Sequence, residues 1–304
     1  MGETMRKTKL NPAIVYLNSL SPSGRRSMRC LLTTALVLLN KRQSIDQFRW
    51  QTLTYADVIT IRMTLKEQGK AINTINLTLA ALRGVMQSAF HLGLIKADQL
   101  LHVQSVKRLP YRPKSTGRSL NQRECKKLIQ QCVRDKTVMG IRDAALLGVM
   151  LTTGLRRNEI RDINLNDYDH TQHELTVTCS KTHSDRVCPI TNSIKKRLRS
   201  WLKIRSNTDG ALFCPILKNK KVVLRPLSTQ AIYTIVQQRG EAAGLGKLTP
   251  HDLRRTYVTR LLDAAVDINI VRQLVGHRDI KTTARYDYRI NDSHKYTRRI
   301  FATI

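Results

Sequence analysis

Two short segments of the chain combine residue types that bind phosphate. Arg156 precedes Glu159 by three residues at the junction of two expected helices, so the carboxylate can orient the guanidinium toward an anion. His251 and Arg254 are also three residues apart, in the first turn of another expected helix. They share one face of that helix near its free N–H groups, where anions are favoured. Either pair alone is also typical of a solvated helix surface, so the pairs are informative only in combination.

Three further residues have side chains that can transfer a proton or attack a phosphorus atom. Lys181 begins a polar turn between two expected strands, and His277 follows Gly276 at an expected turn between two helices. Tyr286 lies nine residues after His277. Lysine and histidine serve as general acids and bases, and a phenol serves as a nucleophile. Each of these residues alone is ordinary surface or packing, so the interpretation depends on the whole set.

The set resembles the motifs of the tyrosine recombinase and phage integrase family in both order and spacing. Five motifs over residues 119–290 carry this resemblance: Gly154-Leu155-Arg156 with Glu159, Lys181 in a hairpin, His251-x-x-Arg254, Gly276-His277, and Tyr286. The resemblance covers most of the second half of the chain, and the combination is highly specific. It implies a site-specific recombinase that cleaves and rejoins DNA strands, with these residues as its catalytic set and Glu159 in support.

The resemblance assigns a role to each residue of the set. Tyr286 is expected to attack a DNA phosphodiester and to form a 3′-phosphotyrosyl bond, with His251 accepting or positioning its proton. Negative charge then develops on the non-bridging oxygens of the phosphate. Arg156 and Arg254 can meet it with bidentate hydrogen bonds, and His277 can add a donor.

Lys181 is expected to protonate the leaving 5′ oxygen. Because the phosphotyrosyl bond conserves the energy needed for rejoining, no nucleotide cofactor is expected. No Asp/Glu cluster of the metal-ligand type lies among the motifs, and two arginines take the place of a metal, so no divalent ion is expected either.

The sequence departs from the family pattern in two places. Arg255 stands where many relatives carry a second histidine, and Arg157-Asn158 replaces smaller residues. Neither change touches the catalytic set. The chain also has no room before residue 11 for the arm-site-binding domain of many phage integrases. We therefore expect the simpler two-domain layout of the Xer-like and Cre-like members.

The elements that must position these residues fall into two parts. Apolar residues in 11–104 recur at spacings of three and four, as in Ile75, Leu79 and Leu82, which predicts a small helical bundle. We expect residues 1–105 to form a helical domain, which the resemblance identifies by size and position as the DNA core-binding domain. Residues 106–118, rich in proline and basic residues, are expected to form a linker.

Residues 119–304 are expected to form a mixed α+β catalytic domain with a C-terminal tail, so the fold class is mostly α with a small antiparallel β-sheet. The patterns predict helices near 121–132, 141–152, 228–243 and 268–275, a helix that begins at Thr249 and a further short helix that begins at Thr282. They also predict strands near 175–179 and 187–190 and a short strand at 211–214.

Charge points to a polyanionic partner. The chain has 53 Lys and Arg against 22 Asp and Glu, a net charge of +31 spread along its 304 residues. Double-stranded DNA is the first candidate, because its phosphates neutralise such charge and release counterions. No stretch is long and apolar enough to span a membrane, and Met1 to Leu10 do not resemble a secretory signal. We expect a cytoplasmic, nucleoid-associated protein that does not bind membranes.

The six cysteines show neither a C-x-x-C pair nor a complete zinc-ligand pattern. We therefore interpret them as reduced thiols whose main role is packing as small hydrophobic side chains.

The resemblance also implies assembly. Four protomers are expected on two DNA sites, with accessory DNA-bending or directionality proteins as further partners. The residues after Tyr286 mix basic and apolar side chains, and Phe301 and Ile304 have few neighbours left in sequence to cover them. We expect both to be buried between subunits; packing against their own domain is the alternative.

Three other functions remain open at this stage. A monomeric type IB topoisomerase-like enzyme uses similar residues, although the two-domain layout argues against it. A catalytically silent DNA-binding protein could use the same fold, although the full set of Arg, Lys, His and Tyr residues argues against silence. A basic structural or RNA-binding protein would account for the charge but not for the motif spacings. The sequence also leaves open whether the chain serves a mobile element by integration and excision or the resolution of DNA.

Overall fold

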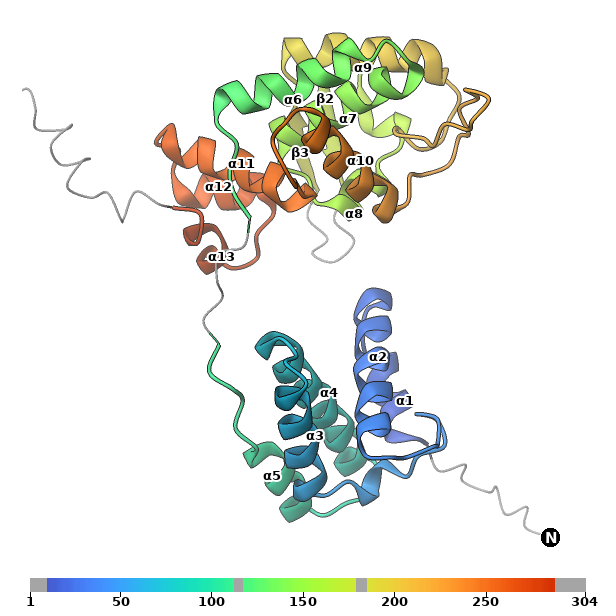
Figure 1. The fold of residues 1–304 in the computed structure, drawn as a ribbon, viewed down its shortest axis with the longest axis vertical. Coiled ribbons are helices and arrows are strands. Elements are labelled where there is room, and N and C mark those ends of the chain that lie inside the picture. Colours follow the sequence, from blue (N-terminus) through green and yellow to red (C-terminus); the bar gives the residue numbers. More distant parts are fainter. Residues whose placement is uncertain (1–9, 112–116, 179–184, 288–304) are drawn as a thin grey trace, which may run out of the picture. The chain divides into compact units, whose positions relative to one another are not determined.

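The computed structural model describes residues 10–111, 117–178 and 185–287 (Figure 1). The chain divides into two compact units, Met1–Lys114 and Ser115–Ile304. In the described parts both units are built mainly from helices, and the second also contains a three-stranded antiparallel sheet. The predicted fold class, mostly α with a small antiparallel sheet, is therefore confirmed.

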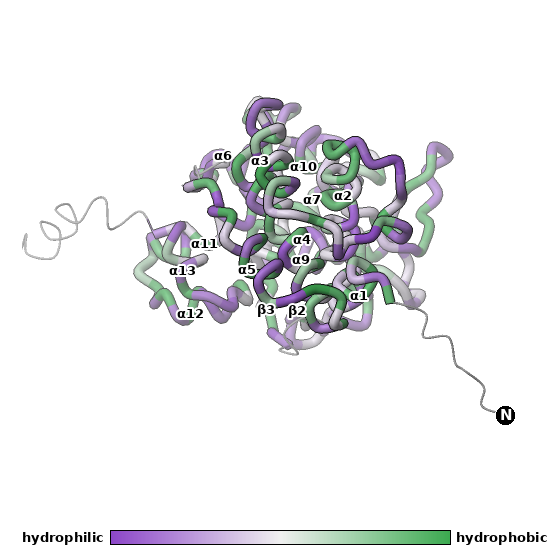
Figure 2. Tube along the Cα trace, turned by 90° about the horizontal axis from the view of Figure 1, so that it is seen from below, coloured by the Kyte–Doolittle hydropathy of each residue, from purple (hydrophilic) through white to green (hydrophobic). Residues whose placement is uncertain are grey.

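The first unit is a helical bundle arranged around one long helix. Its elements are α1 (Pro12–Asn18), α2 (Pro22–Leu38), η1 (Trp50–Thr52), α3 (Tyr55–Glu67), α4 (Ile72–His91) and α5 (Ala97–Ser105). Helix α4 packs against each of the other five elements, and its buried face includes Ile75, Leu79 and Leu82. The tube in Figure 2 shows hydrophobic and hydrophilic residues alternating along the helices, as expected where each helix buries one side.

The segment predicted as a linker is packed at both of its ends. Val106 is buried in the core of the first unit, and the side chain of Asn76 bonds both the backbone N–H and the carbonyl of Leu109, each at 2.9 Å. At the other end, the backbone N–H of Arg118 donates to Asp252 in the second unit at 3.1 Å. These bonds attach the start of the 106–118 segment to the first unit and its end to the second.

The second unit is built around a helix that is buried along nearly its whole length. Its first helices are α6 (Gln122–Arg134), α7 (Val138–Thr153) and α8 (Arg157–Asp162). Helix α7 packs against α6, α9 (Asn192–Arg205) and α11 (Pro250–Asp263). Because neighbours surround it, α7 carries the longest apolar run of the sequence, residues 144–151, rather than a single apolar stripe. It begins three residues earlier than predicted, at a cap formed by Thr137.

Several predicted helix ends are formed by the expected residues. Asn121 with Glu124 and Thr249 with Asp252 each form a capping box, in which the two side chains satisfy backbone N–H groups of the first turn. Gly154 ends α7 in the left-handed conformation, which other residues adopt at a cost of about 1 kcal/mol. The helix boundaries next to the motifs could therefore be predicted from local residue types.

The sheet consists of β1 (Tyr168–Asp169), β2 (Glu174–Val177) and β3 (Arg186–Pro189), in that order. β2 and β3 pair antiparallel, with Leu175 opposite Cys188, as the predicted hairpin requires. The short strand β1 was not predicted. Residues 179–184, including Lys181, lie outside the described residues.

The prediction of a strand at 211–214 is wrong, because these residues form only one isolated β-bridge, between Asn164 and Ala211. Buried side chains satisfy the backbone instead: the Trp201 indole donates to the carbonyl of Leu212 and the Arg205 guanidinium to that of Ala211, both at 2.8 Å.

Four helices complete the second unit: α10 (Thr229–Ala242), α11, α12 (Ile268–Val275) and α13 (Ile280–Ala284). The last three surround a small core that contains Val258, Val271 and Tyr286. Helix α12 has the predicted bounds, whereas α13 begins two residues before the predicted Thr282. Tyr286 lies just beyond the end of α13, which places the C-terminal motif next to α11.

Among the described residues, Cys125, Cys132, Cys188 and Cys214 are free and buried, as expected for packing roles. Cys30 is free but exposed, so its predicted packing role is wrong. In the same parts of the chain no helix is long and apolar enough to cross a membrane.

Candidate active site

The hydroxyl of Tyr286 lies 3.0 Å from Nε2 of His251. The Tyr286 ring stacks on His277 at a centroid distance of 6.1 Å and an interplanar angle of 14°, and the Arg255 guanidinium carbon lies 5.3 Å from the ring centroid. The tyrosine is only 6% exposed. Helix α11 and the turn after α12 therefore hold both the ring and the oxygen of this residue.

Arg254 is buried beneath the site and fixed by two backbone carbonyls. Its Nη1 donates to Gly154 and its Nη2 to Val275, each at 2.7 Å. Burial lowers the pKa of Arg254 to about 10, with a further contribution from the nearby charge of Arg156. The guanidinium is still cationic at neutral pH, and these two bonds orient it.

Arg156, the N-cap residue of α8, is oriented by Glu159 as predicted. Its Nη1 donates to Glu159 Oε1 at 2.9 Å, its backbone N–H donates to Oε2 at 2.7 Å, and its Nη2 donates to the carbonyl of Gly276 at 2.9 Å. These bonds link the start of α8 to the turn after α12, which are 120 residues apart in sequence.

Sequence reasoning missed a second guanidinium on Glu159. Arg186, the first residue of β3, forms an ion pair with Glu159 Oε2 at 2.7 Å and is almost fully buried. Burial alone would raise the pKa of Glu159, but hydrogen bonds and charges from Arg186 and Arg156 hold it below its usual value. In sequence, Arg186 follows a polar turn and is indistinguishable from a solvated arginine, so no spacing signal marked it.

Two histidines of the set are kept neutral by their surroundings. Burial, followed by the charges of Arg254 and Arg156, lowers the pKa of His277 to about 3, and its Nδ1 lies 2.9 Å from the hydroxyl of Thr283. The pKa of His251 is also below its usual value, because its ring is partly removed from water and because Arg255 and Arg254 are nearby. A neutral His251 can accept a proton from Tyr286.

Three of these side chains open onto a shared cavity of about 290 Å³, which is lined by Arg156, His251 and Arg254 among others. Tyr233 of α10 also lines it and was not predicted from the sequence. The cavity presents guanidinium and imidazole groups to whatever enters it, which suits an anion such as a phosphate.

The structure thus brings together Arg156, Glu159, His251, Arg254, His277 and Tyr286 from three separate stretches of sequence. Lys181 lies outside the described residues. Within the described ranges no three His, Cys, Asp or Glu side chains are grouped so that they could hold a metal ion.

Comparison with known proteins identifies the family to which this site belongs. The sequence profile of the phage integrase family matches residues 118–293. The tyrosine recombinase XerA of Pyrococcus furiosus is 30% identical over 233 residues, which are 77% of this chain and 76% of the relative.

Solved structures share the fold. The crystal structure of XerA recombinase matches with a TM-score of 0.51 and 22% identity, over 94% of this chain and 96% of that one. A lambda integrase dimer bound to a COC′ core site matches with a TM-score of 0.67 and 16% identity, over 91% and 92% of the two chains. A lambda integrase tetramer bound to a Holliday junction gives 0.65 and 15%, over 90% and 76%.

The family profile covers more than half of the chain, and the XerA relative covers most of it. This chain therefore belongs to the phage integrase family and is a tyrosine-type site-specific recombinase, an enzyme that breaks and rejoins DNA.

Proposed function

We propose that this recombinase uses Tyr286 as its nucleophile and acts on double-stranded DNA through a 3′-phosphotyrosyl intermediate. The observation that carries this assignment is the 3.0 Å contact between the Tyr286 hydroxyl and Nε2 of His251, beside the cavity that Arg156 and Arg254 line. In that arrangement a phenol, a neutral base and two phosphate-binding cations lie together, as attack on a phosphodiester requires.

In the proposed cleavage step, Oη of Tyr286 forms a bond to the scissile phosphorus while the bond from phosphorus to the 5′ oxygen breaks. The phenolic proton passes to Nε2 of His251. Lys181, which the family motif assigns as the general acid, supplies a proton to the leaving 5′ oxygen. Rejoining is the reverse reaction with the 5′ hydroxyl of another strand.

The two arginines stabilise the charge that develops on the phosphate. Arg254 uses two of its five N–H groups on the carbonyls of Gly154 and Val275, so these bonds fix its plane before DNA binds. Arg156 is fixed in the same way by Glu159 and Gly276. A preorganised pair of guanidinium groups needs no rearrangement when the transition state forms.

His277 supplies a further donor. If the hydroxyl of Thr283 donates to Nδ1 across the 2.9 Å contact, the proton of the neutral ring resides on Nε2. That N–H donates to a non-bridging oxygen of the phosphate. Thr283 thus determines which tautomer His277 adopts.

We further propose that residues 1–105 form the DNA core-binding domain and that four protomers assemble on two sites, with accessory DNA-bending or directionality proteins. The lambda integrase structures, a dimer on a core site and a tetramer on a Holliday junction, support this arrangement, as does the net charge of +31. We infer that the enzyme acts on DNA in the cytoplasm, at the nucleoid, and that it either integrates and excises a mobile element or resolves DNA.

The test is to trap the covalent intermediate on the DNA that flanks the gene of this protein, in excess EDTA and without a nucleotide. We expect the wild-type protein to become attached to a 3′ phosphate, and Tyr286→Phe to lose attachment while it still binds DNA. Tyr288→Phe is the matched control and should remain active. Attachment through Tyr288, or a strict requirement for magnesium in cleavage, would contradict the proposal.

The same experiment separates the alternatives. A wild-type protein that binds this DNA but never becomes attached to it would be a catalytically silent site-binding protein. Cleavage followed only by relaxation of supercoiled DNA, without exchange between two sites, would indicate the topoisomerase-like reaction.

A further inference from the structure

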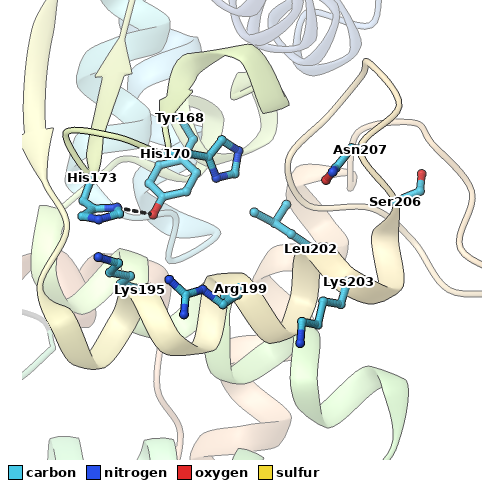
Figure 3. Close-up of a pocket in the computed structure, with 9 residues that line it drawn as sticks. All are labelled: Tyr168, His170, His173, Lys195, Arg199, Leu202, Lys203, Ser206 and Asn207. Atoms are coloured by element: carbon cyan, nitrogen blue, oxygen red, sulfur yellow. Dashed lines mark hydrogen bonds between the residues drawn. The ribbon is translucent and has the colours of Figure 1, made fainter.

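A second basic cavity lies in the same unit, apart from the active site. It has a volume of about 360 Å³ and lies between helix α9 and the turn that joins β1 to β2 (Figure 3). None of the nine described residues that line it is a carboxylate. Five of them are cationic or can become so on protonation: His170, His173, Lys195, Arg199 and Lys203. We call this cavity the α9 pocket.

The helical side of the α9 pocket follows from sequence spacing. Lys195, Arg199 and Lys203 are four residues apart, so they lie along one face of α9. The face that packs toward the core carries Leu198 and Trp201, which are fully buried. Helix α9 is therefore anchored by its apolar side and presents a row of cations to the pocket.

The other side of the α9 pocket is a fixed turn. The carboxylate of Asp169 accepts hydrogen bonds from the backbone N–H groups of Thr171 and Gln172, at 2.6 and 2.9 Å. Figure 3 shows the His173 ring directed toward the hydroxyl of Tyr168, with Nδ1 at 3.4 Å. The ring of His170 packs edge-on against Tyr168 at 4.7 Å. The turn thus holds both imidazoles opposite the cations of α9.

Like charges are concentrated in the α9 pocket. The pKa of His173 lies below its usual value, first because the ring is partly removed from water and then because Lys195 and Arg199 repel a proton. A bound anion reduces this repulsion and accepts hydrogen bonds from ammonium, guanidinium and imidazole groups at once.

The α9 pocket is separated from the active site by the length of the sheet. Arg186, at the start of β3, contacts Glu159 of the active site. At the far end of the strand, the N–H of Ile190 donates to the carbonyl of His173 at 2.8 Å. Four residues of extended chain span about 13 Å. A phosphate held between Arg156 and Arg254 cannot contact the α9 pocket as well.

We propose that the α9 pocket is a second phosphate-binding site, which takes a phosphate group other than the one that the active site holds. The group comes either from the backbone of a DNA segment outside the cleavage site or from a free phosphate compound. This proposal does not depend on the roles assigned to Tyr286 and its neighbours.

The experiment uses the full chain with isotope-labelled histidines, whose ring resonances are followed by NMR. The signals of His170 and His173 are identified from the single variants His170→Gln and His173→Gln. Inorganic phosphate is then added at constant ionic strength, with chloride as the replaced anion. We expect saturable shifts of the His170 and His173 signals.

A charge-matched pair of variants gives the test its specificity. Lys195→Gln/Arg199→Gln removes two cations of the α9 pocket and should weaken phosphate binding about tenfold or more. Lys126→Gln/Lys196→Gln removes two exposed cations outside it and should bind phosphate like the wild type. Thermal unfolding of both variants checks that they are folded.

A parallel titration with a duplex of unrelated sequence distinguishes the two sources. Shifts of the same two signals with duplex identify a DNA phosphodiester as the ligand, and shifts with inorganic phosphate alone identify a free phosphate compound. Either result supports the site. The proposal is overturned if neither ligand moves these signals, or if the Lys195→Gln/Arg199→Gln protein responds as strongly as the wild type.

Discussion

At the scale of residues, contacts position the aromatic ring of Tyr286 as well as its hydroxyl, and Arg255 makes one of the ring contacts. The guanidinium carbon of Arg255 lies 5.3 Å from the ring centroid, while His277 stacks on the same ring. A cation over an aromatic face contributes about 0.5–2 kcal/mol. Arg255, which stands where many relatives carry a second histidine, thus contacts the ring of the proposed nucleophile.

Replacing Arg255 by leucine should therefore slow covalent attachment without abolishing it. A loss of about 0.5–2 kcal/mol corresponds to a roughly 2- to 30-fold lower rate at saturating DNA. Arg255→Lys, which keeps the charge, should be less impaired. Arg260→Leu removes an exposed arginine from the same helix and is the control. An Arg255→Leu protein that reacts at the wild-type rate would show that the ring contact has no role in positioning.

His277 should make the stability of the protein depend on pH. Its pKa in the folded protein is about 3, against about 6.5 in an unfolded chain. Below pH 6.5 the unfolded chain therefore binds a proton that the folded protein does not. The free energy of unfolding should fall as pH decreases from about 6.5 toward 3, by up to about 1.4 kcal/mol per pH unit, and His277 should contribute no pH dependence above that window.

Urea unfolding of the wild type and of His277→Gln at pH 7, 6 and 5 measures this contribution. The variant should lose less stability between pH 6 and 5, while His251 retains part of the dependence. Equal slopes for the wild type and His277→Gln would show that His277 is not buried in its neutral form.

At the scale of elements, the C-terminal end of α7 requires a glycine at position 154. Gly154 has a φ of +62°, its carbonyl accepts from Arg254, and an added Cβ would lie 2.4 Å from Cδ1 of Tyr257. The glycine is therefore required both by its backbone conformation and by a close neighbour.

Gly154→Ala should destabilise the second unit by about 2–4 kcal/mol, the sum of left-handed strain and overpacking. Gly246 also has a positive φ, of 71°, but an added Cβ would meet no atom within 4 Å. Gly246→Ala should therefore cost only about 1 kcal/mol. Denaturant unfolding measures both, and covalent attachment should be impaired in Gly154→Ala alone. Equal effects of the two substitutions would rule out the contact with Tyr257 as the cause.

The elements of the site could be predicted where a local rule determines them. Gly154, Asp267 and Gly276 mark helix ends because capping depends on adjacent residues only. Arg186 could not be found in this way, since its partner Glu159 is 27 residues distant in sequence. The false strand at 211–214 has another cause, because the side chains of Trp201 and Arg205, on the preceding helix α9, bond the carbonyls of Leu212 and Ala211.

At the scale of the whole molecule, the net charge of +31 suits an enzyme that breaks and rejoins DNA. The predicted assembly depends on the C-terminal tail. Residues 288–304, with Phe301 and Ile304, lie outside the described residues, so their burial between subunits remains a prediction.

Removing residues 297–304 tests it. We expect the cooperative advantage on paired sites to fall roughly tenfold, because coupling between bound protomers is lost, while binding to a single half-site changes little. Gel-shift titrations on half-sites and paired sites measure the difference, and strand exchange should decline with cooperativity. A truncated protein that assembles and recombines like the full chain would refute the intersubunit role.

The contact between Arg156 and the carbonyl of Gly276 joins residues that are synthesised 120 positions apart. On the ribosome, Arg156 and Arg254 emerge before Tyr286, the proposed nucleophile. A chain that stops after His277 keeps Arg156, Arg254 and the Gly276 carbonyl but lacks the phenol of Tyr286, so it is expected to occupy recombination sites without cutting them. Premature termination late in translation would then yield an inhibitor of the finished enzyme rather than a weaker copy of it.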